Sequence, residues 1–194
     1  STTGNTLDGA GNELVSFTDQ AVTNGIAGAS LVDITYPTVG NVTQSGTIWT
    51  AGTNGATCLS AQKLASGADG YYQMEWQSSG LSETVIMSLD PDNALESFGA
   101  MKFGAYFTAS GIRLVENGTL INTPNGTNRT PAAGDLIRLR RAGSSMFIEW
   151  SSDGGTSWTL GHTFTATDTG ILYCKGWFAT NGTQIKNPKG YNVS

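Results

Sequence analysis

The sequence predicts an all-β protein, folded as a two-sheet antiparallel β-sandwich. Glycine accounts for 26 of the 194 residues and charged residues for only 13%, a balance that favours turns and strands over helices. Apolar and polar residues alternate in short segments, which is the period of a half-buried strand. Turn residues separate these segments at intervals of roughly 8 to 12 residues without helical patterns between them, which indicates a sandwich or barrel.

Residues 1–45 are polar, rich in glycine and carry only weak apolar pairs, such as Leu14/Val15 and Leu31/Val32. Three interpretations stay open for this stretch: an arm that packs along the domain, a short β segment, or a connector to something upstream. We therefore divide the chain into an N-terminal arm or connector, residues 1–45, and a β-sandwich domain, residues 46–194.

Four strands are expected in the first half of the domain: Thr47–Trp49, Ala56–Gln62, Tyr71–Trp76 and Thr84–Leu89. Alternation in the last two places six side chains on the inner face: Tyr72, Met74, Trp76, Val85, Met87 and Leu89. The stretch Asp90–Asn93 ends the fourth strand, because proline and Asx residues favour a turn. Ala94–Ser97 is expected to form one helical turn.

Met101–Phe107 alternates again, with Met101, Phe103, Ala105 and Phe107 predicted to point inward. Asn117 and Gly118, flanked by Ile112–Val115 and Leu120–Ile121, predict a hairpin with a type I′ turn, because both positions tolerate a positive φ. Residues 123–133 are expected to form a loop.

The stretch Gly134–Phe164 predicts three consecutive antiparallel strands. A two-residue turn at Gly143 and Ser144 sets the register of the first pair, which we list as partners: Arg141 with Met146, Leu139 with Ile148, Ile137 with Trp150, and Arg138 with Glu149. Ile171–Phe178 follows, and a last strand lies around Ile185 or Tyr191–Val193. About ten to twelve strands are expected in all.

The turn between the second and third of these strands reads Ser-Ser-Asp-Gly-Gly-Thr-Ser-Trp and resembles the Asp-box hairpin of sialidases and other β proteins. Its four signature positions are Ser151, Asp153, Gly155 and Trp158. Asp153 is expected to accept backbone hydrogen bonds, Gly155 to adopt a positive φ, and Trp158 to cap the loop. The role of this motif is structural, and one copy does not make a propeller.

A wider resemblance covers about residues 56–194. Segments such as ATCLSAQ, YYQMEW, RLVENGTLI and GDLIRLRRAGSSMFIEWSSDG follow one another as in the concanavalin A-like lectin/glucanase jelly roll. The paired strands around the Gly turn resemble those of secreted lectin modules, SPRY-like domains and phage fibres. The resemblance implies a non-catalytic module of the phage-fibre or surface type, and no motif carries a ligand residue over.

Charge narrows the classes of partner. A formal charge of −5 and a pI near 4.7 argue against nucleic acid and anionic membranes, since a basic stripe is lacking. Apolar runs fall short of the ~18 residues that a membrane span needs, and residue 1 does not begin a signal peptide. We expect a soluble, mature or excised protein at an extracellular or virion surface.

The two cysteines, Cys58 and Cys174, leave two alternatives open. An extracellular setting permits a disulfide between them, while the alternation around Cys174 also suits a buried thiol.

Candidate ligand residues come from the side chains predicted to face outward: Gln73, Glu75, Lys102, Tyr106, Arg138, Arg140, Glu149, Tyr173, Lys175 and Trp177. Aromatic planes beside Gln, Glu and Arg suit a sugar, whose C–H faces stack and whose hydroxyls hydrogen-bond. We select six as ligand-binding: Trp177, Tyr106, Tyr173, Glu75, Arg138 and Arg140. The alternative is an ordinary surface in which Arg138 and Glu149 form a cross-strand ion pair.

Catalysis is not expected. The paired carboxylates of glycosidases are missing, and His162 has no nucleophile or metal ligand at a recognisable spacing. No cofactor is expected, although Asp90, Asp92 and Asn93 offer oxygen ligands for Ca²⁺. The alternative for these three residues is a turn with Asx caps.

Three functions follow in order. A non-catalytic module for attachment to a cell-surface glycan or polysaccharide comes first. A structural or receptor-binding protein of a virion, tail fibre or surface filament comes second, and a glycoside hydrolase is a distant third. In the first two settings we expect a homo-oligomer or a part of a larger particle or multidomain chain, because repetition strengthens weak sites.

Overall fold

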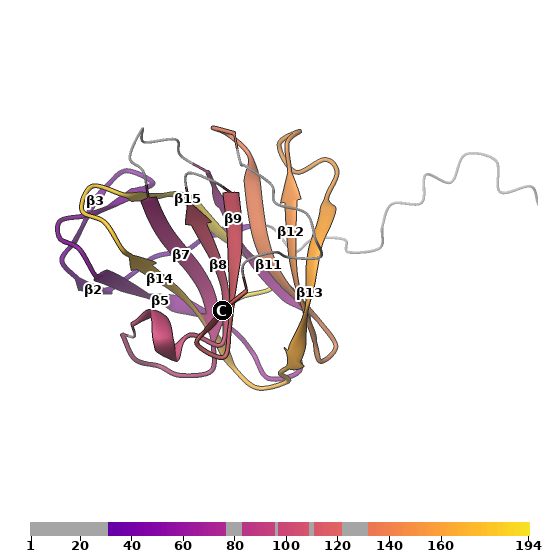
Figure 1. The fold of residues 1–194 in the computed structure, drawn as a ribbon. Helices are drawn as coiled ribbons and strands as arrows, with labels where there is room; N and C mark the ends of the chain where they lie inside the picture. Colours follow the sequence, from indigo (N-terminus) through magenta and orange to yellow (C-terminus); the bar gives the residue numbers. More distant parts are fainter. Residues whose placement is uncertain (1–30, 77–82, 96, 109–110, 122–131) are drawn as a thin grey trace, which may run out of the picture.

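The computed structural model describes residues 31–76, 83–95, 97–108, 111–121 and 132–194, which form two antiparallel sheets packed face to face (Figure 1). One short 3₁₀ turn, η1 (Phe98–Ala100), accompanies them. The predicted all-β sandwich is confirmed.

The first sheet, called sheet I below, has the strand order β13-β12-β11-β6-β15-β4-β3, with β1 paired to β15. Its strands are β13 (Thr159–Thr167), β12 (Ser145–Ser151), β11 (Leu136–Ala142), β6 (Gly70–Glu75), β15 (Gln184–Tyr191), β4 (Ile48–Ala51), β3 (Val42–Ser45) and β1 (Val32–Asp33).

Sheet II has the order β10-β9-β8-β7-β14-β5-β2. Its strands are β10 (Thr119–Ile121), β9 (Gly111–Glu116), β8 (Phe103–Thr108), β7 (Glu83–Asp90), β14 (Leu172–Phe178), β5 (Ala56–Leu64) and β2 (Thr38–Gly40). Neighbours in the sheets are often distant in sequence, as β14 is inserted between β7 and β5.

The β11–β12 hairpin has the predicted register. Arg141 lies opposite Met146, and Arg138 lies opposite Glu149. Gly143 supplies the positive φ of 61° that the tight turn requires. The register places one face of β11 in the core and the other on the outside of sheet I.

The β9–β10 hairpin also forms as predicted. Asn117 and Gly118 have φ values of 49° and 72°, which are the values of a type I′ turn. The Gly118 amide donates to the Met101 carbonyl oxygen at 2.8 Å, so the turn lies against the segment that precedes β8. Most of the predicted loop of residues 123–133, namely residues 123–131, lies outside the described residues.

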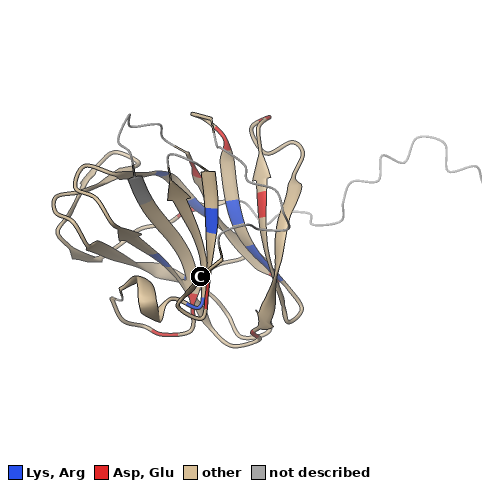
Figure 2. Cartoon of the chain, viewed as in Figure 1, with Lys and Arg blue, Asp and Glu red and all other residues tan. Residues whose placement is uncertain are grey.

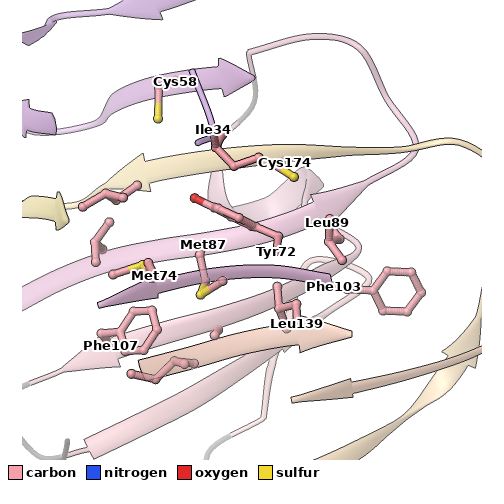
Figure 3. Close-up of a cluster of buried hydrophobic side chains, with 14 of the residues drawn as sticks. Ile34, Cys58, Tyr72, Met74, Met87, Leu89, Phe103, Phe107, Leu139 and Cys174 are labelled. Carbon is pink, nitrogen blue, oxygen red and sulfur yellow. The ribbon is translucent and has the colours of Figure 1, made fainter. Parts of the chain in front are cut away.

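A single apolar core fills the space between the sheets (Figure 3). It includes most of the residues predicted to point inward, with side chains at or near zero exposure: Tyr72, Met74, Val85, Met87, Leu89, Phe103, Ala105 and Phe107. Trp76 is partly buried and packs against this core. Cys58 and Cys174 are both buried free thiols, so the thiol alternative holds and the disulfide is not formed.

A second, smaller cluster lies on the outer face of sheet II, where Ile86, Met101 and Val115 are buried. The prediction that Met101 points into the core between the sheets was therefore wrong. Met101 precedes β8 and caps η1, so the strand alternation does not reach it. The helical turn is also displaced, from the predicted Ala94–Ser97 to Phe98–Ala100.

Two differences concern the ends of the chain. Residues 38–45, assigned by sequence to the arm, contribute β2 to sheet II and β3 to sheet I, while residues 1–30 lie outside the described residues.

At the other end, β15 runs from Gln184 to Tyr191. A bulge between Lys186 and Lys189, with Asn187 at a φ of 47°, shifts the alternation, so the sequence located the last strand around Ile185 or Tyr191–Val193 but not its full length. The described residues form 15 strands, more than expected because several are very short.

Candidate functional site

The six predicted ligand residues do not form one site. Glu75, Arg138 and Arg140 lie on the outer face of sheet I, because their neighbours along β6 and β11 point into the core. Tyr106, Tyr173 and Trp177 lie on the outer face of sheet II. The full thickness of the sandwich separates the two groups.

The rings of the aromatic residues on sheet II already contact other side chains of the protein. Tyr106 and Trp177 pack against Phe98 of η1, with ring centroids 6.0 and 6.1 Å from that of Phe98. Both belong to the edge of the smaller apolar cluster. The Lys63 Nζ lies 5.9 Å from the Tyr173 ring centroid. These contacts leave less free aromatic surface than the sequence indicates.

Sheet I instead carries a groove, called the β6–β11 groove below, with a volume of about 510 Å³. The residues that line it include Tyr71, Arg138, Arg140, Trp158, Tyr191 and Asp69. The pairing of β6 with both β11 and β15 brings Arg140 and Tyr191 to the two sides of Tyr71. The groove thus combines residues from three strands and one turn.

Four planar groups stack along this groove. The Arg138 guanidinium lies 3.8 Å from the Trp158 ring centroid and 4.8 Å from that of Tyr71. Tyr71 in turn stacks on Tyr191, with centroids 5.2 Å apart and planes inclined by 13°. Cation–π contacts of this kind hold a guanidinium in place while leaving its N–H groups directed along its edge.

The Glu149 carboxylate on β12 holds both arginines. Its Oε2 accepts from the Arg138 Nε at 2.5 Å, and Arg140 donates to both oxygens at 3.0 and 2.9 Å. Burial raises the pKa of Glu149, but the hydrogen bonds from Arg140 and Arg138 outweigh it and bring the pKa below its usual value. Glu149 is therefore ionised at neutral pH with both oxygens engaged by the arginines.

Glu75 lies on the same face but has protein partners of its own. Its oxygens accept from the Lys186 ammonium at 2.6 Å and from the Asn187 amide at 2.5 Å. Burial raises the pKa of Glu75, and these two partners lower it below its usual value. Glu75 is thus an ionised, paired carboxylate outside the groove.

Hydrogen bonds within the turn of residues 151–158 place Trp158 over the groove. The Asp153 carboxylate accepts from the Ser157 amide at 3.0 Å, and the Ser151 hydroxyl accepts from the Gly155 amide at 2.9 Å. Gly155 has a φ of 92°, and the Trp158 indole donates to the Gly155 carbonyl oxygen at 3.1 Å. Hydrogen bonds from Ser151 and Ser157 hold the pKa of Asp153 well below its usual range.

Arg141 lies next to Arg140 on β11, among the residues that line the groove, and its side chain is fully buried. Its guanidinium donates to three backbone carbonyl oxygens, of Ala68 at 2.7 Å, Gly170 at 2.5 Å and Ala65. These bonds fix the loops before β6 and β14 against the β11–β12 turn. The sequence predicted that Arg141 lies opposite Met146 but contained no indication of the carbonyl partners of its guanidinium.

Asp90, one of the three residues considered for Ca²⁺, already has protein partners at its carboxylate. The Asp90 carboxylate is buried, accepts from the Lys102 and Asp92 amides, and lies 3.8 Å from the Lys175 ammonium. A cationic neighbour disfavours a second cation at the same carboxylate. Burial raises the pKa of Asp90, which further reduces its value as a ligand.

In the described ranges, no three His, Cys, Asp or Glu side chains gather in a way that could hold a metal ion. His162 lies within β13, half-buried, with its ring edge-on to Phe164 at 5.6 Å. No helix among the described residues has the length and apolarity to cross a membrane.

Sequence reasoning missed three of the groove residues as ligand candidates. Tyr71 was predicted to face outward with Glu75 but was not selected, and Trp158 was assigned to its turn alone. Tyr191 could not be placed, because the β15 bulge hides its pairing with Tyr71. The alternation that puts Tyr71 on the same face as Glu75 was the available indication, whereas its position opposite Arg140 comes from the pairing of β6 with β11.

Comparisons with known proteins identify a fold. No family model matches the chain, and no curated protein matches it by sequence. The solved exoplasmic/lumenal domain of VIP36, in a form bound to Ca²⁺ and Man3GlcNAc, is similar with a TM-score of 0.55 and 10% identity, over 80% of this chain and 82% of that one.

Two SPRY domains are similar to the same degree. For the SPRY domain of human HERC1 the TM-score is 0.56 at 18% identity, over 79% of this chain and 95% of that one. For the PSpry domain of TRIM65 the TM-score is 0.57 at 12% identity, over 80% and 91%. The chain therefore has the β-sandwich fold that these lectin and SPRY domains share.

Proposed function

We propose that this chain is a non-catalytic carbohydrate-binding module whose ligand lies in the β6–β11 groove. The observation that carries the proposal is the row of Trp158, Arg138, Tyr71 and Tyr191 along a groove of about 510 Å³. Aromatic faces stack on the C–H surfaces of sugar rings, and guanidinium groups hydrogen-bond their oxygens. A groove of this size suits a small ligand or a short stretch of a longer chain.

The fold supports a binding role. A VIP36 domain with the same fold has been solved with a mannose-containing glycan, and SPRY domains share the fold as well. The proposed site uses Arg138 and Arg140 from the predicted set and adds Tyr71, Trp158 and Tyr191. Tyr106, Tyr173 and Trp177 form an alternative site on sheet II, and Glu75 lies beside the groove as an accessory residue.

The proposed setting is an extracellular or virion surface, with several copies displayed together. A shallow groove buries little of a sugar, so a single site binds weakly, and repetition raises the effective concentration. Attachment to a host-cell glycan by a fibre or surface particle is the use that suits such a module. The hydrogen bonds of the 151–158 turn support its resemblance to an Asp-box hairpin.

The experiment is a glycan array followed by titration calorimetry with the best ligand. Tyr191→Ala should weaken binding by about tenfold or more, because it removes one of the stacked planes. Trp158→Ala should weaken it further, with some loss of stability because this indole also caps its turn. Tyr173→Ala is the matched control, since it removes a half-buried tyrosine from the other sheet.

A site on sheet I and a site on sheet II predict opposite effects of these variants. Loss of binding in Tyr173→Ala with full binding in Tyr191→Ala would transfer the site to sheet II. Absence of binding to every glycan by the unaltered protein would instead favour a purely structural role in a particle or filament.

A further inference from the structure

Resting on the proposed function, we infer that the β6–β11 groove selects acidic sugars, with Arg140 and Arg138 as the partners of a carboxylate or sulfate on the sugar ring. The ligand class is thus an anionic oligosaccharide rather than a neutral one. The inference comes from the hydrogen-bonding capacity and the charge of the groove.

The groove has more donors than acceptors. Each guanidinium carries five N–H groups. Arg138 donates through Nε to Glu149 and is also hydrogen-bonded to the Tyr71 side chain, and Arg140 uses Nε and Nη2 on Glu149. Six N–H groups therefore remain on the two side chains, while both Glu149 oxygens are already engaged. A carboxylate or sulfate only accepts hydrogen bonds, whereas a hydroxyl both donates and accepts, so an anionic group matches this surplus.

Charge at the groove points the same way. Arg138 and Arg140 share a single carboxylate, that of Glu149, so two positive charges meet one negative charge at this pair. Asp69, which also lines the groove, accepts from the Gly143 amide. Figure 2 shows basic segments along β11 beside an acidic segment on β12. The chain as a whole has a net charge of −5, so this face departs from the rest of the molecule.

Contacts within the protein fix the arginine side chains in the groove before any ligand binds. Arg138 is fixed between the Trp158 and Tyr71 rings, and its side chain is 13% exposed, while that of Arg140 is 29% exposed. Tyr71 does not compete as an anion, because burial raises the pKa of its hydroxyl even though Arg138 lowers it. Arranged donors of this kind lose little freedom when an anion binds.

The test compares ligands that differ only in charge. The probes are a short oligogalacturonate, its methyl ester, and a sulfated oligosaccharide with its desulfated form, each titrated by calorimetry at low ionic strength. We expect the charged member of at least one pair to bind about tenfold more tightly than its neutral form. The pair that shows the difference identifies the anionic group.

The variants locate the effect. Arg140→Gln should abolish the preference for the charged ligand, and Arg140→Lys should keep part of it, because a lysine retains the charge but loses the planar fork. The matched control is Arg113→Gln on β9 of sheet II, which removes the same charge from the other face and should leave the preference intact. Thermal unfolding verifies that each variant is folded.

Each remaining outcome is decisive. Equal or tighter binding of the neutral forms would overturn the inference and leave the proposed function standing. Binding of neither form of either pair would also overturn the inference, while the glycan array decides the proposed function separately. An equal loss in Arg113→Gln, or full competition by acetate at the concentration of the sugar, would also overturn the inference, because selection would then not depend on this groove or on the sugar ring.

Discussion

At the scale of single residues, Trp158 shows how one side chain serves a turn and a surface together. Its indole N–H closes the turn by donating to Gly155, while its ring covers the Arg138 guanidinium. The sequence motif accounts for the first contact. The second contact follows from the register that places Arg138 on the outer face of β11, so a residue expected to be structural becomes part of the proposed groove.

Glu149 leads to a prediction on pH dependence. Its pKa is lowered in the folded state, so its contribution to stability is complete above the unfolded pKa of about 4.3 and is lost as the pH falls through the folded value. Glu149→Gln should lower the Tm at pH 7 and reduce the fall in Tm on acidification below about pH 4. Thermal unfolding of both proteins across this range measures the difference.

Glu116 on sheet II is a suitable control, since Glu116→Gln also removes one carboxylate, from the other sheet. An acid dependence of Tm that Glu149→Gln leaves unchanged would show that the pairing with Arg138 and Arg140 contributes little to folding.

At the scale of elements, the two tight hairpins are determined by local chemistry but differ in what surrounds them. Gly143 and Gly118 both have a positive φ. The Gly143 turn has open space around the position of a Cβ atom, whereas a Cβ at Gly118 would lie 2.1 Å from the Gly99 carbonyl oxygen. The β9–β10 turn is thus packed closely on η1, whereas the β11–β12 turn has room for a Cβ atom at Gly143 although its backbone is hydrogen-bonded to Asp69 and Asp168.

Substitution by alanine should separate these two situations. Gly143→Ala should cost about 1 kcal/mol, the strain of a left-handed conformation. Gly118→Ala should cost about 3 kcal/mol or more, because backbone must also move. Urea denaturation of the two variants gives both free energies of unfolding. Equal losses of stability would show that the contact with η1 does not limit the space at Gly118.

At the scale of the whole molecule, the sandwich has two unlike outer faces. The outer face of sheet II carries a small apolar cluster beneath η1, while that of sheet I carries the paired charges and the stacked aromatic groove. Between them, β5 and β14 bring Cys58 and Cys174 into the core as free thiols.

These thiols lead to a prediction on redox conditions. Burial raises the pKa of both, for Cys174 to about 12, so neither is a reactive thiolate in the folded protein. The Tm should be the same with and without a reductant, and a thiol reagent should titrate two cysteines only after unfolding. A fall in Tm on reduction would show that the disulfide forms in solution.

The sequence by itself determined what depends on neighbours along the chain. The all-β class, the β11–β12 register, the two tight turns and the inward residues of β6 and β7 follow from alternation and turn chemistry, which are local properties. Local alternation also identified Arg138 and Arg140 as outward residues.

Only the tertiary structure decided which outward residues meet. Alternation shows that a side chain points away from the core, but it does not show to which sheet the strand belongs. Trp177 and Arg138 were therefore equivalent by sequence, whereas the strand order places β14 in sheet II and β11 in sheet I. Tyr191 pairs with Tyr71 only because a bulge in β15 interrupts the two-residue alternation. Met101 lies outside the core between the sheets, because β8 begins two residues after it. Long-range pairing selects among patterns that are locally alike, and for that reason the groove could be recognised only in the folded chain.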